Sequence, residues 1–554
     1  MGKKSKPLHP DAPLLHPDHP RPKTRRDFLR QGFIAGTGTV MSSGIMSLFA
    51  NPREAMALSN DIITDPILPP NCRVGGSVGP VLPVICFDLA GGAAMAGSNV
   101  LGGGPGGQLD LLSTAGYSRM GLPPERMPDN AANVNEQLGL LFQSDSQMLS
   151  GILDKVDVNT TLPNINGALI AARSDNDTAN NPHNPMYAIA EAFKNDMRVS
   201  STGTDGGVIS LIGSRNSDSG GNSVAPPRFM NPEWRPAKVD RPTDVTGMVD
   251  IGNLNAILDT SDVVAAMESM VRISHAKLSR ASLSTGLSPT RDEVLKDMVR
   301  CGYISAADLA ERFGDVKVDP RLDPHIITQP NDEGVTNGIF EETEFNNDRE
   351  FQKTASVMKM VIDGHAGVGT ITMGGYDYHT GDRVTGERRD ERAGRCMGAC
   401  MEYAARRGVP LLLYVFSDGS VFSNGTPDAG AGGKGVWTGD NSGTAGSFFL
   451  LFDPTGRPAI APEFQQIGWY SRAGAVVTGS NPAGNNVNQL VHMVLLNYMS
   501  ANGMIDPGNM APFLNIFNRL GINHGLGDLT SEGQERYLRS LMVLPPIGTP
   551  APPP

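Results

Sequence analysis

Cysteine is scarce in this chain, and several other signals that would assign a function are missing. The 554 residues include five cysteines, an odd number, without the Cys-x-x-Cys spacing of zinc and redox sites. No G-x-G-x-x-G motif opens a βαβ unit beside a suitable acid, and no cysteine run fits a haem or an iron–sulfur cluster. A cofactor-bearing oxidoreductase therefore has no supporting motif. Cys396 and Cys400 are expected to be buried thiols on a helix.

The chain also lacks an excess of basic residues and, beyond its first 57 residues, any long apolar run. Its net charge is −12, and residues 1–57 carry nine Lys or Arg and four Asp or Glu, so their removal would take the charge to −17. An acidic chain offers no electrostatic basis for binding nucleic acid or an anionic membrane. No later stretch is apolar enough to predict a stable membrane anchor.

The first 57 residues have the pattern of an export signal. Arg25 and Arg26 precede a moderately apolar stretch that ends at Ala55-Met56-Ala57. A twin-arginine pair followed by such a stretch and an A-x-A cleavage site is typical of proteins that the twin-arginine machinery exports. Residues 31–50 are too rich in Gly, Ser and Thr to favour permanent residence in a bilayer. We therefore expect a periplasmic or secreted protein whose partner during export is that machinery.

Five short apolar runs have the form of strands that end in acidic residues. Helical patterns at 133–153, 347–365, 387–408 and 485–503 lie between or after them. This alternation predicts an α/β fold with a mostly parallel sheet and helices on both faces. The carboxyl ends of such strands meet at one crevice, where the acids are expected to converge. The runs are 80–92 with Asp88, 165–177 with Asp175 and Asp177, 367–379 with Asp377 and His379, 409–420 with Asp418, and 446–456 with Asp453.

Composition divides the chain into five parts. Residues 201–345 are rich in Pro, Gly and Asn, with helical patterns near 253–279 and 291–313, and this favours a large insertion or cap over central strands. The last residues read PPIGTPAPPP, which is typical of a solvated tail. The expected parts are a signal peptide at 1–57, the first part of the α/β core at 58–200, the insertion at 201–345, the second part of the core at 346–540, and a disordered Pro-rich tail at 541–554.

Asp377 and His379 form the most specific chemical pattern, in the stretch GGYDYHTGDR at 374–383. Residues two apart on a strand face the same side, so one carboxylate and one imidazole would lie together. That pair suits zinc, manganese or iron, and further carboxylates could complete a one- or two-metal site. In the alternative, Asp377 caps a turn and His379 is a surface residue.

The order of these segments resembles a twin-arginine-exported family of unknown function that is related to alkaline phosphatases and sulfatases. Its Gly-Gly-Phe/Trp-Asp-Thr-His motif is matched by residues 374–379, and later motifs by Ser417-Asp418 and Asp440-Asn441-Ser442. The resemblance implies an alkaline-phosphatase-like fold and a metal-dependent hydrolase of phosphate or sulfate esters, acting on a small anionic substrate. It places His183 at a family histidine, and the metal ligands become Asp377, His379, Asp418, Asp440, His183 and Asp88.

Several family positions are changed in this chain. Ala94 stands in place of an acid, Pro182 in place of a serine, Asn441 in place of a histidine, and an arginine after Asp418 is missing. Asp88, with Asp175 and Asp177, could replace the lost ligands, and such an oxygen-rich set would favour calcium, magnesium or manganese over zinc. Each of these Asp residues could instead cap a turn or a helix.

A nucleophile is harder to identify than a metal site. Thr178 and Ser174 follow an expected strand, where backbone N–H groups can receive an anion, and neither stands beside an activating base. Two functions stay open from the sequence. One is the exported metal-dependent ester hydrolase with Thr178 and Ser174 as catalytic candidates, and the other is a catalytically degenerate exported binding or assembly protein of the same fold.

Overall fold

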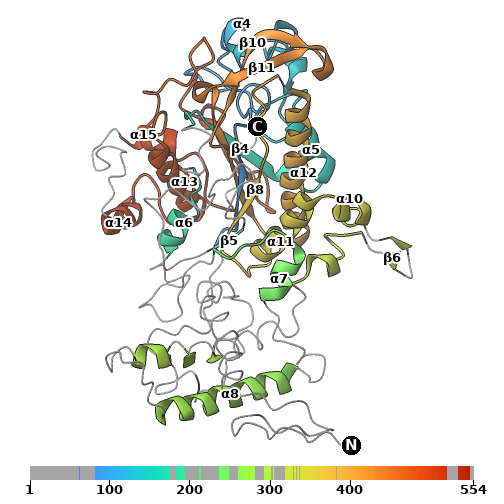
Figure 1. Ribbon diagram of the computed structural model, residues 1–554. Helices are drawn as coiled ribbons and strands as arrows, with labels where there is room; N and C mark the ends of the chain where they lie inside the picture. Colours follow the sequence, from blue (N-terminus) through green and yellow to red (C-terminus); the bar gives the residue numbers. More distant parts are fainter. Residues whose placement is uncertain are drawn as a thin grey trace, which may run out of the picture.

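A seven-stranded sheet forms the centre of the protein (Figure 1). The computed structural model describes residues 81–174, 183–193, 211–213, 236–248, 260–280, 337–381, 383–520 and 534–548, together with Ile62 and short stretches between residues 292 and 335. The strand order is β13-β4-β12-β9-β1-β8-β5. The strands are β1 (Val84–Leu89), β4 (Ile165–Ile170), β5 (Leu211–Gly213), β8 (Val368–Met373), β9 (Leu411–Phe416), β12 (Ser447–Phe452) and β13 (Gln466–Ile467).

Six of the seven strands run in the same direction. β1 pairs in parallel with both β8 and β9, β8 pairs in parallel with β5, and β13 pairs in parallel with β4. β12 is antiparallel to its neighbours β4 and β9. The carboxyl ends of the six parallel strands and the start of β12 therefore meet at one edge of the sheet. The predicted α/β fold with a mostly parallel sheet is confirmed.

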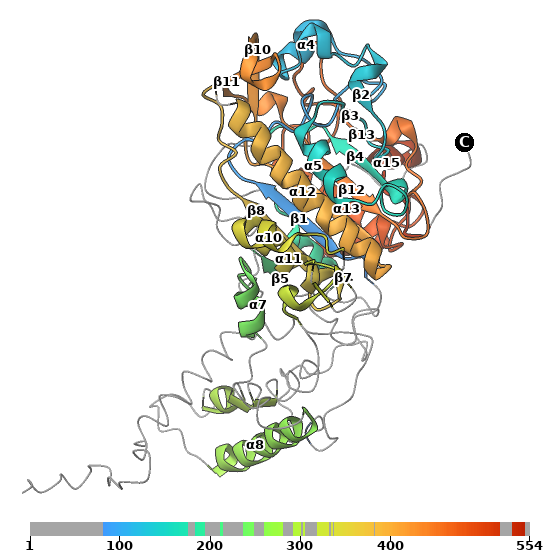
Figure 2. The same cartoon turned by 90° about the vertical axis from the view of Figure 1, so that its right-hand side faces the viewer.

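Helices cover both faces of the sheet. Successive side chains of each strand point to opposite faces, and both sets are mostly apolar and buried. Ile85 and Phe87 of β1 belong to a core shared with the buried side chains of α5, α11 and α12, whereas Cys86 belongs to a second core with α6, α13, α14 and α15. Figure 2 shows the long helix α12 lying across the first face. These helices are α5 (Gln147–Lys155), α6 (Met186–Phe193), α11 (Arg349–Ile362), α12 (Arg383–Arg407), α13 (Val487–Ala501), α14 (Ala511–Leu520) and α15 (Gln534–Leu541).

Further elements complete the described structure. The hairpin of β10 (Val421–Asp428) and β11 (Lys434–Asp440) lies beside α4 above the carboxyl edge of the sheet (Figure 1). No helix among the described residues combines the length and the apolarity that crossing a membrane requires. The other elements are α4 (Thr114–Arg119), α7 (Pro242–Met248), α8 (Thr260–Arg280), α10 (Glu342–Asn347), β2 (Val134–Asn135), β3 (Phe142–Gln143), β6 (Pro330–Asn331) and β7 (Gly334–Val335).

All five predicted strands are present, but one of them runs against the others. Because β12 is antiparallel, Asp453 at its carboxyl end lies at the opposite edge of the sheet and cannot join the other acids. Its buried carboxylate instead accepts hydrogen bonds from the backbone N–H groups of Thr455 and Gly548. The helix predicted at 133–153 is also partly wrong, since α5 begins only at Gln147 and the residues before it form β2, β3 and turns.

The predicted division of the chain needs two corrections. β5 lies within 201–345 yet forms an edge strand of the main sheet, and Phe340 of the same segment is buried in the core, so this segment is not wholly an insertion. The tail predicted at 541–554 is packed as far as residue 548, because Val543 and Leu544 are buried and Ser500 Oγ donates to the Leu544 carbonyl. The signal peptide predicted at 1–57 lies outside the described residues. Cys396 and Cys400 are buried thiols, as expected.

Candidate metal centre

Two glycine-containing loops shape the edge of the sheet where the candidate site lies. The loop after β8 hydrogen-bonds to the loop after β1 through the Tyr376 N–H and the Ala90 carbonyl, 3.1 Å apart. A Cβ atom at Gly91 would lie 2.6 Å from the backbone nitrogen of Asp377, and Gly91 has a φ of +122°. Only glycine allows this conformation and this close approach, so the two loops fix the backbone at Asp377.

Two buried tyrosines set the direction of the Asp-x-His motif. Tyr376 and Tyr378 are almost fully buried; the Tyr376 hydroxyl donates to the Arg389 carbonyl, and the Tyr378 hydroxyl accepts from the Ala94 N–H. The residues that alternate with them, Asp377 and His379, point toward solvent with 42% and 29% of their side chains exposed. The motif lies just beyond the end of β8, and the prediction that Asp377 and His379 face the same side is confirmed.

The β10–β11 hairpin supplies a third side chain to this motif. Asp440 is the last residue of β11, and Arg383 of α12 holds that hairpin by donating to the Gly435 carbonyl and lying over the Trp437 ring. The Trp437 carbonyl in turn accepts from the Gly381 N–H at 2.7 Å, two residues after His379. The hairpin is thereby fixed against the segment that carries the motif.

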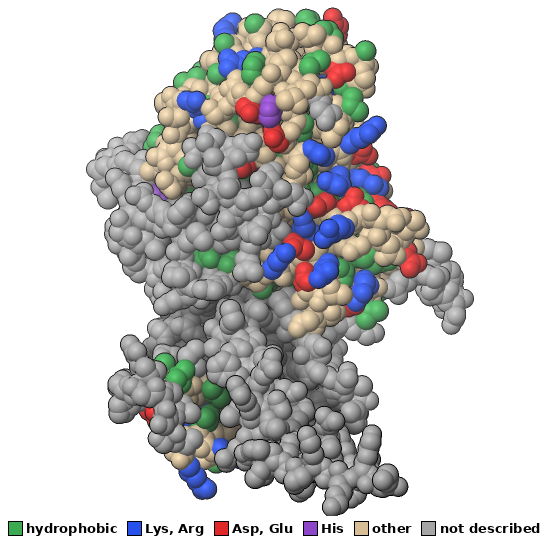
Figure 3. Space-filling view, in the orientation of Figure 1, with side chains coloured by type: hydrophobic (Ala, Val, Ile, Leu, Met, Phe, Trp, Pro, Cys, Tyr) green, Lys and Arg blue, Asp and Glu red, His purple; other side chains and the backbone are tan. Residues whose placement is uncertain are grey.

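The three side chains converge around one point. Nδ1 of His379 contacts Oδ1 of Asp377 and lies 3.1 Å from Oδ1 of Asp440. One ligating atom from each residue lies within 4.8 Å of the other two, as the donors of a single bound cation would. Figure 3 shows a histidine between acidic side chains on the surface of the molecule. We call Asp377, His379 and Asp440 the metal triad.

The side chains of the triad act on the charge of Asp440. Partial burial and the neighbouring Asp377 carboxylate raise the pKa of Asp440, whereas the His379 ring lowers it, and the net direction is upward. Nδ1 of His379 is buried and makes no hydrogen bond of good geometry with described residues, although two carboxylate oxygens lie beside it. One imidazole and two carboxylates are a ligand set that zinc and manganese accept, with positions left for water or substrate.

The remaining predicted ligands do not belong to the triad. Asp418 is buried, and its Oδ1 accepts from the Gly91 N–H at 2.8 Å, so it fixes the loop after β1. Asp88 is fully buried within β1, beside Thr372 and Phe416, on the face of the sheet opposite to Phe87. The position of Asp88 follows from strand alternation, which turns a carboxylate near the end of a strand toward either face.

His183 is also buried, with its ring centre 6.3 Å from that of Phe416. Burial lowers the pKa of His183 to about 3, so its imidazole is neutral over the physiological range. Ser174, a predicted nucleophile, is buried after β4, and its hydroxyl makes no hydrogen bond with described residues. Thr178, Asp175 and Asp177 lie outside the described residues.

Sequence reasoning missed the arginines of α12 that lie next to the triad. Arg383 is buried and donates to Gly121, Ser98 and Gly435 of β11. Arg388, Arg389 and Arg392 line a pocket beside Gly374 and Gly375. The only sequence signal is the run GERRDERAGR at the start of the helix, which reads equally as a solvated helix face. No family model, curated protein or solved structure matches this chain significantly.

Proposed function

We propose that this protein is an exported, metal-dependent hydrolase of phosphate or sulfate esters, built on an alkaline-phosphatase-like fold. The observation that supports the proposal most is the metal triad at the carboxyl edge of a mostly parallel sheet. Ligand sites of open α/β sheets lie at this edge. The Asp-x-His motif at residues 374–379 is also the part of the chain that carries the family resemblance.

The residues of the triad would hold one divalent ion, such as zinc or manganese. A bound ion of this kind supplies Lewis acidity and lowers the pKa of a coordinated water. His379 offers a ring nitrogen, while Asp377 and Asp440 offer negative charge that offsets that of the cation. Because 57% of the Asp440 side chain is exposed, a small ester can approach the triad from solvent. The tyrosines behind the motif keep its geometry fixed in the absence of substrate.

A catalytically degenerate binding protein is the second candidate, and specific observations favour it. The Asn441 side chain, at a family histidine position, accepts from the Gly443 N–H and so caps a helical turn instead of facing the triad. Ser417 and Asp418, which match a family motif, bind the backbone of the loop after β1. Three ligands are enough for one cation, and a structural cation would use the same three side chains.

Replacing Asp440 with asparagine tests the hydrolase against this alternative. Asp440→Asn removes one charged oxygen ligand, and we expect metal affinity to fall at least about tenfold and hydrolysis of p-nitrophenyl phosphate or sulfate to fall with it. Asp428→Asn is the matched control, because Asp428 lies at the far end of the same hairpin, opposite Lys434 in the strand register. If Asp440→Asn loses metal binding but the wild type hydrolyses neither ester, the degenerate binding protein is favoured.

A further inference from the structure

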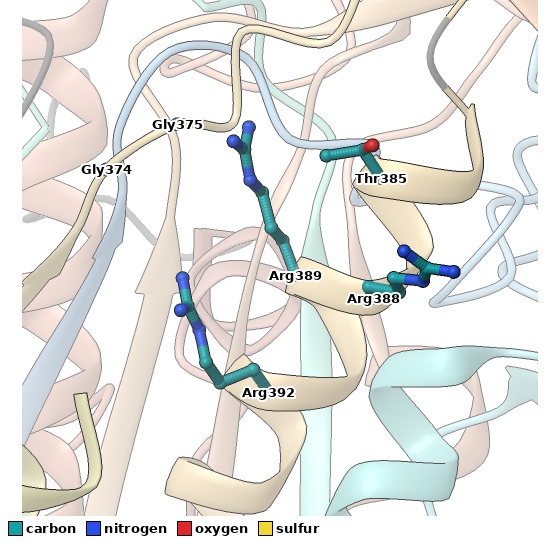
Figure 4. A pocket seen from close by; sticks show the side chains of 6 residues that line it. All are labelled: Gly374, Gly375, Thr385, Arg388, Arg389 and Arg392. Atoms are coloured by element: carbon teal, nitrogen blue, oxygen red, sulfur yellow. The ribbon is translucent and has the colours of Figure 1, made fainter. Parts of the chain in front are cut away.

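A pocket lined by arginines lies beside the metal triad. Its volume is about 480 Å³, which suits a small molecule. In Figure 4 the side chains of Arg389 and Arg392 extend toward the glycine segment after β8, whereas Arg388 extends away from it. The pocket is lined by Gly374, Gly375, Thr385, Arg388, Arg389 and Arg392, and we call it the arginine pocket.

The arginines are placed where they repel one another. Arg389 and Arg392 are three residues apart on α12, and both extend to the same side of the helix in Figure 4. Like charges at this spacing destabilise a helix by a few tenths of a kcal/mol per pair. A cluster with this cost to the fold suggests a function for the positive charge.

Two acids of the same helix are engaged away from the cluster. Glu387 accepts from Arg383 and Lys434, and Asp390 accepts from Asn99 in the core. Arg388 and Arg389 make no ion pair within the described part of the chain. Arg392 reaches one carboxylate, that of Asp348, at 4.0 Å.

The donors of the pocket are arranged for an oxyanion. Gly375 has a φ of +85°, and a Cβ atom there would lie 2.7 Å from Cζ of Arg389, so the guanidinium rests on bare glycine backbone. The Nε atom of Arg392 is buried and has no hydrogen-bond partner among the described residues. A guanidinium presents several N–H donors in a planar fork that matches phosphate and sulfate oxygens.

The pocket and the triad are connected through the backbone. Gly375 precedes Asp377 by two residues, so their Cα atoms are at most about 7 Å apart. An anionic group on Arg389 would therefore lie within a small molecule's length of the triad.

We propose that the arginine pocket binds a phosphate or sulfate group of a small molecule, with Arg389 and Arg392 as the oxyanion ligands, and holds that molecule next to the metal triad. The identity of the molecule as an ester substrate rests on the proposed function. The binding of the anion by the arginines does not, because it requires no metal. The acidic charge of the whole chain makes a small anion a better ligand than a nucleic acid.

Calorimetric titration of the full chain with inorganic phosphate, and separately with sulfate, tests this proposal in a buffer of low ionic strength that contains EDTA. The wild type should bind phosphate saturably, and Arg389→Gln and Arg392→Gln should each weaken binding about tenfold or more. Arg389→Lys, which keeps the charge and removes the fork, should give a smaller loss. Comparing the two titrations shows which oxyanion the pocket prefers.

Arg395→Gln is the matched control on the same helix, because Arg395 pairs with Asp154 and Glu344 outside the pocket. It should change phosphate affinity less than about twofold, as expected for loss of one distant charge. Circular dichroism checks that each variant is folded. The proposal would be overturned if the Arg389 and Arg392 variants bound phosphate as tightly as the wild type does. It would also be overturned if the wild type bound no phosphate.

The EDTA condition separates this proposal from the proposed function. If phosphate binds only when metal is present, and His379→Ala abolishes binding while Arg389→Gln does not, the anion sits on the metal alone and the arginine pocket is refuted. If the arginine variants lose phosphate binding and the wild type holds no metal, the pocket is supported and the metal-dependent hydrolase is refuted.

Discussion

His379→Ala is expected to abolish both metal binding and ester hydrolysis. The substitution removes the only nitrogen donor of the metal triad and leaves two carboxylates that are 42% and 57% exposed, which form a weak site. Changes outside the ligand shell typically cost 10–100-fold in metal affinity, so loss of a ligand should cost at least about 100-fold. A free metal concentration of 100 times the dissociation constant would raise the unfolding free energy of the wild type by about 2.7 kcal/mol. Thermal unfolding of His379→Ala should not show this metal-dependent stabilisation.

His325→Ala is the control for this experiment, because His325 is exposed and lies outside the triad. It should keep the wild-type metal affinity and the metal-dependent increase in unfolding temperature. A His379→Ala protein that binds zinc and manganese as tightly as the wild type would show that the triad is not the metal site.

Asp390→Asn is expected to stabilise the protein at neutral and alkaline pH. Burial raises the pKa of Asp390 to about 7, with Glu387 adding to the rise and Asn99, Arg383 and Tyr378 opposing it. The unfolded chain has an ordinary Asp pKa near 3.9, so between about pH 4 and pH 7 the folded state binds more protons. The contribution of Asp390 to the free energy of unfolding is therefore complete below the pKa of the unfolded state, and it is lost as the pH rises through the folded pKa of about 7.

The expected size of this effect is about 2–3 kcal/mol between pH 5 and pH 8. It is measured as the difference in unfolding free energy between the wild type and Asp390→Asn in urea, since the subtraction removes the contributions of other groups. Glu391→Gln, at the exposed neighbouring position, should show no such pH-dependent difference. A constant difference between Asp390→Asn and the wild type from pH 5 to pH 8 would contradict the raised pKa.

The sequence was sufficient to predict the sheet and the central pair of the site. Each apolar run that ends in small and acidic residues became a buried strand, because burial on both faces requires continuous apolar sequence. Asp377 and His379 lie together because residues two apart in an extended segment share a side. Asp440 lies with them as predicted, at the end of a β-hairpin.

The local sequence pattern does not predict the direction in which a strand runs. Nor does it predict which group a carboxylate will contact. Nothing in the run at 446–456 shows that β12 runs against its neighbours, and this reversal places Asp453 at the wrong edge for the site. Asp418 has the same local sequence character as Asp377, but a backbone N–H of the loop after β1 occupies its Oδ1. Such differences depend on contacts between residues hundreds of positions apart.

The arginine pocket escaped prediction for a related reason. The charges of a polar helix face are usually solvated and paired with one another, and the alternating acids of the segment at 387–392 suggest that arrangement. In the structure Asp390 turns into the core and Glu387 pairs with Arg383 and Lys434, which leaves positive charge facing Gly375. Only the packing of α12 on the sheet determines which charges are left.

Metal content of the purified wild-type protein is the most direct measurement of the central claim, that Asp377, His379 and Asp440 bind one divalent cation. After dialysis against a dilute mixture of zinc, manganese, calcium and magnesium, elemental analysis should find about one divalent ion per chain. A content below about 0.1 ion per chain for all four metals would contradict the claim.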